Sequence, residues 1–151
     1  MTLLRSSEHN QLLVRVEHLV VGHLPNMDKA HVKKLVWCRN HWVIVLHQGT
    51  DLLGAVVFRP CPSHHFVELA FCVVSAKHQR KGIGGVLLSR LRSVAASLRL
   101  PHVLTFADDT ATDFFQKHGF SKQLTLAPAH YHWLIKRYVA STMMEMVCEL
   151  S

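Results

Sequence analysis

The chain has 151 residues, of which 49% are apolar and 18% charged. This length suits one domain that buries roughly 70% of its unfolded surface, and the apolar content excludes a disordered chain. No apolar run approaches the ~20 residues of a membrane span, and the N-terminus lacks the features of a secretory signal. We therefore expect one soluble, unsecreted domain over residues 1–151.

The protein is basic. The sequence contains 17 Lys and Arg residues and 10 Asp and Glu residues, which gives a formal charge of +7. Such a charge favours an anionic partner, namely a phosphorylated cofactor, a nucleic acid or an acidic surface. The sequence lacks the basic stripe with interleaved aromatic residues that binds single strands, so direct DNA binding is not predicted.

Hydrophobic spacing in the first half predicts two helices followed by strands. Apolar residues recur at helical intervals over 9–21, and a second helix is expected over 28–36 with Asp28 near its start. Segments 42–47 and 53–59 flank a turn-rich tetrapeptide and predict a hairpin. A long apolar strand is expected over Phe66–Ser75.

The second half alternates helices and strands. An amphipathic helix is expected over about 85–98, with an apolar face formed by Leu87, Leu91, Val94, Ala95 and Leu98. After a strand over 102–106, Asp108 and Asp109 supply N-cap chemistry for a helix ending near His118, and Gly119 suits its C-terminus.

The last third is predicted to be mainly strand. Residues 120–126 and 131–135 are interpreted as strands, and 143–150 as a strand or a core helix. The whole chain is therefore predicted to be a mixed α/β domain.

The cysteines and histidines predict neither disulfides nor a metal site. Cys38, Cys61, Cys72 and Cys148 contain no C-x-x-C pair, and an intracellular chain keeps thiols reduced. Segment 61–65 resembles half a zinc site, but no second pair completes it. The histidine pairs at 64/65 and 130/132 are interpreted as surface residues.

A glycine-containing loop between the apolar strand and the next helix predicts an anion site. Over 79–85, glycines allow the backbone to approach a ligand, and free N–H groups at the helix start favour negative charge. Arg80 and Lys81 add side-chain charge. The phosphate-loop and dinucleotide fingerprints are both absent, and an ordinary turn before a helix is the alternative.

Glu68 is the one charged residue between Phe66 and Ser75. A carboxylate in such a strand is either solvated at a sheet edge or desolvated, and desolvation makes it a better base near neutral pH. Its place shortly before the glycine loop favours the second interpretation.

The sequence resembles a known enzyme superfamily. Gln79-Arg-Lys-Gly-Ile-Gly matches the Q/R-x-x-G-x-G/A motif of the GNAT acyltransferases. Further segments resemble, in order, the catalytic domain of PCAF-type histone acetyltransferases: Leu24-Pro-Asn-Met, Phe66-Val-Glu-Leu-Ala-Phe-Cys-Val-Val, Leu104-Thr-Phe-Ala-Asp, Phe114-Phe-Gln-Lys-His-Gly-Phe-Ser-Lys, Ile135-Lys-Arg-Tyr and Cys148-Glu-Leu.

The resemblance implies a GNAT fold, with a central, mostly antiparallel sheet, a splayed parallel strand pair and flanking helices. It implies direct transfer of acetyl from acetyl-CoA to a histone-tail lysine, with Glu68 as general base and no metal. It also implies a nuclear protein that joins a larger transcriptional coactivator complex. The cofactor-binding residues would be Cys72, Val73, Val74, Gln79, Arg80, Lys81, Gly82, Ile83, Gly84, Gly85, Ala111, Phe114 and Phe115.

Several positions depart from the family pattern. Val73 replaces a small residue, Ile83 an aromatic residue, Gly85 a hydroxyl residue and Thr110 a tyrosine. Phe114 stands where a tyrosine is usual, so we expect the CoA thiolate to leave without a tyrosine acid. About two extra residues precede Cys148, and the family's first strand looks short or missing.

Three alternatives stay open at this point. The acceptor could be a protein N-terminus or a small-molecule amine, or the chain could be an inactive CoA-binding or DNA-associated module. Cys72 also invites transfer through an acetyl-cysteine, although no motif histidine is placed to activate it.

Overall fold

The computed structural model describes residues 1–5, 10–24, 27–132 and 141–150, and these form a mixed α/β fold. The strand order of the six-stranded sheet is β1-β2-β3-β4-β5-β6. The chain divides into two compact units, and the strand β4 (Phe66–Val74) and the helix α3 (Ile83–Ser97) each contribute to both. Unit 1 comprises Met1–Arg59 and Ala70–Leu91, and unit 2 comprises Pro60–Leu69 and Arg92–Ser151.

Unit 1 is built on an antiparallel sheet with two helices on one face. Its complete elements are β1 (Thr2–Arg5), α1 (Asn10–His23), α2 (Lys29–Trp37) and β2 (Trp42–Gln48); β3 (Asp51–Cys61) lies in it almost entirely. Asp28 caps α2, since its carboxylate accepts a hydrogen bond from the N–H of Ala30 at 3.2 Å. The predicted hairpin is confirmed, with β2 and β3 antiparallel.

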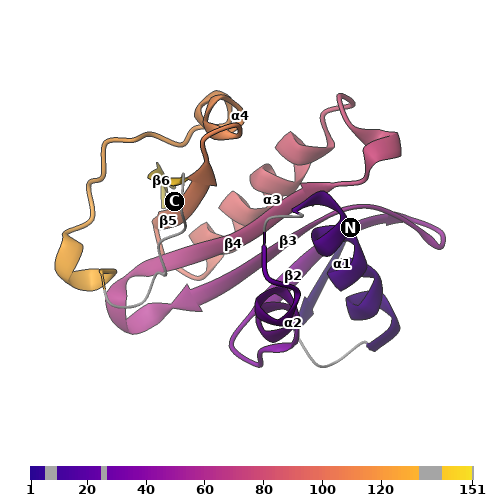
Figure 1. Cartoon of the computed structure of the whole chain (residues 1–151). Coiled ribbons are helices and arrows are strands. Elements are labelled where there is room, and N and C mark those ends of the chain that lie inside the picture. The colour runs from indigo at the N-terminus through magenta and orange to yellow at the C-terminus, as the bar shows by residue number, and fades with distance from the viewer. Residues whose placement is uncertain (6–9, 25–26, 133–140, 151) are drawn as a thin grey trace. The chain divides into compact units, whose positions relative to one another are not determined.

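Apolar side chains at alternate positions of the hairpin form part of the core of unit 1. Val43 and Val45 of β2 lie in register with Val57 and Ala55 of β3, and all four pack in one apolar cluster with residues of α1 and α2. Figure 1 shows these two helices beside the hairpin. Because side chains alternate between the two faces of a strand, this cluster occupies a single face of the sheet.

Gly54 of β3 marks the close approach of α3 (Ile83–Ser97) to the sheet in unit 1. A Cβ atom there would lie 2.9 Å from Leu87 Cδ1 and 2.9 Å from the carbonyl oxygen of Val73. A side chain at position 54 would therefore collide with the main chain at Val73 and force the Leu87 side chain to move.

Unit 2 contains the parallel strand pair. The first half of β4 (Phe66–Val74) pairs in parallel with β5 (His102–Asp108), from Phe66↔His102 to Leu69↔Thr105. Strand β6 (Ser141–Val147) pairs antiparallel with β5. One face carries an apolar cluster that includes buried Phe66, Leu104, Leu126 and Tyr131.

Most predicted elements are confirmed, with small shifts at their ends. Helix α3 ends at Ser97, so Leu98 does not belong to its buried face and is 47% exposed. The C-terminal segment is a strand, and β1 is present although it has only four residues. Gly119 follows α4 (Thr112–Lys117) with a φ of 96°, as its predicted C-terminal role requires.

Two predictions in the second half are wrong. Residues 120–126 form no strand; Ser121 makes an isolated bridge with Glu145, and the segment continues as turn and loop. Asp108 and Asp109 do not cap α4, because its N-cap is Ala111 and the Asp108 carboxylate instead binds the N–H and hydroxyl of Thr110. Of the predicted strand 131–135, Tyr131 and His132 lie in a turn, and 133–135 fall outside the described residues.

Candidate functional site

The predicted anion-binding loop lies in unit 1, between β4 and α3. Arg80 and Gly82 both adopt left-handed backbone, with φ of 63° and 80°, and α3 begins at Ile83. Left-handed residues that alternate with ordinary ones turn successive N–H groups toward one concave side. The first N–H groups of a helix have no acceptor within the helix, so those of Ile83, Gly84 and Gly85 suit an anion.

Arg80 and Lys81 are exposed in this loop, and Gln79 folds back on it. The amide Nε2 of Gln79 donates a hydrogen bond to the carbonyl oxygen of Val74 at 3.3 Å. Gln79 therefore fixes the loop to the end of β4, while the two cations stay available to a ligand.

The loop is also tied to β3. His78 Nε2 lies 3.1 Å from Asp51 Oδ2, and the N–H of Ser75 donates to the carbonyl oxygen of Leu53 at 2.8 Å. Sequence reasoning missed the contact between His78 and Asp51, because the two residues are 27 positions apart and neither stands out locally.

Cys72, Val73 and Val74 form the end of β4 in unit 1. Val73 is buried, whereas the other two residues are half-buried. Burial raises the pKa of the Cys72 thiol to about 12, so the thiol stays protonated at neutral pH. Because the thiolate is the reactive form, this environment disfavours Cys72 as a nucleophile.

Glu68 lies in unit 2, in the first half of β4. In the sheet order β4 is an internal strand, and Glu68 is half-buried in register with Leu104 of β5. The position favours a partly desolvated carboxylate over a solvated glutamate at a sheet edge.

Helix α4, in unit 2, carries the remaining predicted cofactor residues. Phe115 is buried and Phe114 half-buried, with their rings 5.2 Å apart in an edge-to-face arrangement, and Ala111 is the N-cap. The ring of Phe114 also lies 4.8 Å from that of His118. The structure therefore places 72–74 and 79–85 in unit 1 and Glu68 and the α4 residues in unit 2, and β4 runs through both.

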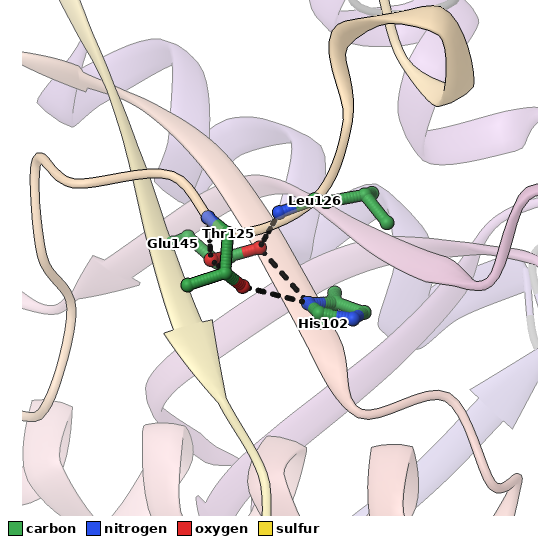
Figure 2. Close-up of polar contacts among 4 residues, drawn as sticks. All are labelled: His102, Thr125, Leu126 and Glu145. Carbon is green, nitrogen blue, oxygen red and sulfur yellow. Dashed lines mark hydrogen bonds and ion pairs between the residues drawn. The ribbon is translucent and has the colours of Figure 1, made fainter.

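Unit 2 contains a buried carboxylate that sequence reasoning missed. Glu145 of β6 is 2% exposed and accepts hydrogen bonds from Thr125, Leu126 and His102 (Figure 2). The available signal was a single acidic residue inside the apolar run 143–148.

Three of the histidines interpreted as surface residues gather in unit 2. The rings of His64 and His65 lie 6.2 and 5.8 Å from that of His130, and His64 and His130 are half-buried. In the part of the chain that the structure describes, no group of three His, Cys, Asp or Glu side chains is arranged to hold a metal ion. Across the same residues, no helix has the length and apolar character needed to cross a membrane.

Comparison with known families agrees with the fold and the loop. The model of the acetyltransferase (GNAT) family matches residues 15–120, which include β4, the glycine loop and α3. The chain belongs to the GNAT family.

Curated proteins that are similar to this chain include histone acetyltransferases. The chain is 35% identical over 139 residues to histone acetyltransferase GCN5 of Oryza sativa, covering 91% of this chain and 27% of the relative. It is 31% identical to the GCN5 of Yarrowia lipolytica, covering 93% of this chain and 31% of the relative. The chain thus spans about a quarter to a third of the length of these curated relatives.

Solved structures of Tetrahymena GCN5 share the fold. One superposes with a TM-score of 0.91 at 26% identity, covering 100% of this chain and 98% of that one. A second, the catalytic domain in complex with coenzyme A, gives a TM-score of 0.77 at 29% identity, covering 97% and 90% of the two chains. The expected GNAT fold is confirmed.

Proposed function

We propose that this protein is an acetyl-CoA-dependent lysine acetyltransferase that acts on histone tails by direct transfer. The observation that carries the proposal is Glu68, a half-buried carboxylate on an internal strand that leads into the anion-binding loop. The GCN5 names of the similar proteins support a histone substrate.

The loop of unit 1 would bind the cofactor. The backbone N–H groups at the start of α3, together with Arg80 and Lys81, would hold the pyrophosphate of acetyl-CoA. The coenzyme A in the Tetrahymena GCN5 complex supports this ligand. Main-chain groups of Cys72, Val73 and Val74 would pair with the acetyl-pantetheine arm.

Glu68 would remove the proton that blocks the reaction. A lysine ammonium has a pKa of ~10.4 and cannot attack until it is deprotonated. Glu68, directly or through a water, takes that proton; the amine nitrogen then bonds to the thioester carbonyl carbon, the C–S bond breaks, and the nitrogen releases its second proton to solvent as the amide forms. The electron pair leaves with the CoA thiolate. Phe114 stands where a tyrosine acid is usual, and the thiolate needs no such acid because a thiol pKa of ~8.5 makes it a good leaving group.

The acceptor side must be locally acidic if it binds a basic tail. The candidates for such charge, all in unit 2, are the half-buried Glu68 and the exposed Asp108, Asp109 and Asp113. The overall positive charge would then serve the cofactor phosphates. Binding of a histone peptide should weaken as salt increases. From the GCN5 names of the similar proteins we also propose a nuclear location and membership of a coactivator complex.

A protein N-terminus or a small-molecule amine is the competing acceptor, and a panel assay separates the candidates. The protein is incubated with acetyl-CoA and, separately, histone tails, N-terminal peptides and polyamines, and acetylated products are measured. We expect acetylation of histone-tail lysines. Acetylation of another acceptor class alone would overturn the histone assignment.

Glu68→Gln tests the mechanism in the same assay. We expect kcat to fall about 100-fold or more at neutral pH, with the Kd for CoA unchanged, because the amide cannot accept the proton. Glu149→Gln, which neutralises an exposed acid, is the matched control and should stay active. A fully active Glu68→Gln variant would remove Glu68 as the base.

A further inference from the structure

The carboxylate of Glu145 is fully engaged although it is buried. Its Oε1 accepts the N–H and the hydroxyl of Thr125, both at 2.7 Å. Its Oε2 accepts the N–H of Leu126 at 3.2 Å and contacts His102 Nδ1 at 2.9 Å (Figure 2). Burial alone raises the pKa of Glu145, but the bonds from Thr125 and the contact with His102 outweigh it and hold that pKa below its usual value. The carboxylate is therefore ionised at neutral pH.

Glu145 lies in the same row of the sheet as Glu68. Leu104 of β5 is in register with Glu68 on one side and with Glu145 on the other. Residues in register project from the same face, and neighbouring strands are ~4.8 Å apart, so the two Cα atoms are about 10 Å from each other. Both carboxylates thus belong to one face of the sheet in unit 2.

The segment that Glu145 holds covers this face. The main chain of Glu145 exchanges two hydrogen bonds with Ser121, and its side chain holds Thr125 and Leu126. Leu126 packs in one cluster with Phe66 and Leu104. Phe66 precedes Glu68 by two residues on its strand, and Leu104 stands beside Glu68 on the next strand. The segment 121–126 is thus fixed over the apolar surroundings of Glu68 by a carboxylate on β6.

We propose that Glu145 is a positioning residue for Glu68: it holds Thr125 and Leu126 against the sheet and so maintains the apolar cover beside the base. This role rests on the proposed function. It does not involve the glycine loop, which lies in unit 1. Loss of Glu145 should therefore slow the transfer step without weakening the binding of the cofactor pyrophosphate by the glycine loop.

Glu145→Leu tests the proposal, because leucine keeps the bulk of the side chain and removes all four acceptor contacts. We expect kcat to fall about tenfold or more, because small displacements of an active-site wall carry large rate costs. The KM for acetyl-CoA and the Kd for CoA should stay within twofold of the wild type. Glu149→Gln is the control, since Glu149 is exposed near the end of the same strand.

Thr125 supplies a milder variant should Glu145→Leu fail to fold. Thr125→Val removes one donor from an exposed residue and should lower kcat about threefold, and Thr125→Ser, which keeps the hydroxyl, should restore it. Rescue by serine would not occur if the segment acted through bulk alone. Unchanged kcat in a folded Glu145→Leu, or in Thr125→Val, would overturn the proposal.

Hydrogen exchange separates this proposal from the proposed function. The amide protons of Thr125 and Leu126 should be protected in the wild type and exposed in Glu145→Leu. Wild-type protein that transfers no acetyl group to any acceptor would refute the proposed function. Active wild-type protein whose Thr125 and Leu126 amides exchange freely would refute the role of Glu145 alone.

Discussion

The two units bury polar side chains in opposite ways. His41, just before β2 in unit 1, is 2% exposed, and among the described residues neither ring nitrogen has a hydrogen-bond partner. Burial, helped by the charges of Arg59 and His31, lowers the pKa of His41 to about 4. Glu145 in unit 2 is also 2% exposed, yet it is surrounded by donors and stays charged.

The difference shows that the free-energy cost of burying a titratable side chain can be met in two ways. A buried group can be kept neutral, as His41 and the Cys72 thiol are in unit 1, or it can be charged and fully hydrogen-bonded, as Glu145 is. Under the proposed function, unit 1 would bind the cofactor mainly through main-chain N–H groups and the exposed cations Arg80 and Lys81. Unit 2 keeps the ionised carboxylate of Glu145 on its sheet face.

The largest effect expected from this comparison is a loss of stability in mild acid. Because the pKa of His41 is about 4 in the folded chain and about 6.5 when unfolded, the unfolded state binds the proton more readily. Stability present above pH 6.5 should fall as the pH drops toward 4, by about 3 kcal/mol in the free energy of unfolding. Urea unfolding at pH 7, 5.5 and 4.5 measures it.

His41→Phe is the matched variant, since it keeps a flat ring and cannot be protonated. It should lose this pH dependence between 6.5 and 4.5. Glu145 acts in a different window: its lowered pKa contributes stability above its ordinary value of 4.5, which is lost only as the pH falls below that. If the free energy of unfolding of His41→Phe still fell with pH between 6.5 and 4.5 as steeply as in the wild type, His41 would not be the buried neutral group that we infer.

Gly82→Ala tests whether the main chain of the glycine loop in unit 1 binds CoA. A φ of 80° strains any residue with a Cβ, although no atom would crowd it there. The loop should relax and the Kd for CoA should rise about tenfold, as measured by calorimetry, while fold stability changes little. Gly22→Ala, in open space at an ordinary φ within α1, is the control and should leave CoA affinity unchanged.

The smallest effect is expected for Cys72→Ala. With its thiol pKa near 12, Cys72 carries no thiolate at neutral pH and should form no acetyl-enzyme. Under the proposed function, the kcat of Cys72→Ala should stay within about threefold of the wild type. Mass spectrometry of the wild-type protein after incubation with acetyl-CoA should find no acetyl group on Cys72. An acetylated Cys72 that decays as product forms would reverse this conclusion.

Local sequence signals were enough wherever the structure depends on near neighbours. Asp28 before an amphipathic run predicted the start of α2, and alternation predicted the β2–β3 hairpin. The glycines of 79–85 predicted the loop before α3. These features follow from capping, from side-chain periodicity and from backbone freedom, each of which acts within a few residues.

The two failures have different causes, one long-range and one local. Residues 120–126 contain apolar residues that predicted a strand, but the segment is held by the side chain of Glu145, about 20 residues later in the chain. Asp108 looked like a helix cap, but its carboxylate binds Thr110 instead. The site assignments from Cys72 to Phe115 remain predictions that rest on the resemblance.

The sequence by itself determined the order and type of most elements and the family, and it predicted residues for a transfer site. Only the tertiary structure decided which polar groups are charged, since the pKa of a side chain depends on partners that folding brings from distant parts of the chain. His41 stays neutral and Glu145 ionised because burial left one without donors and surrounded the other with them.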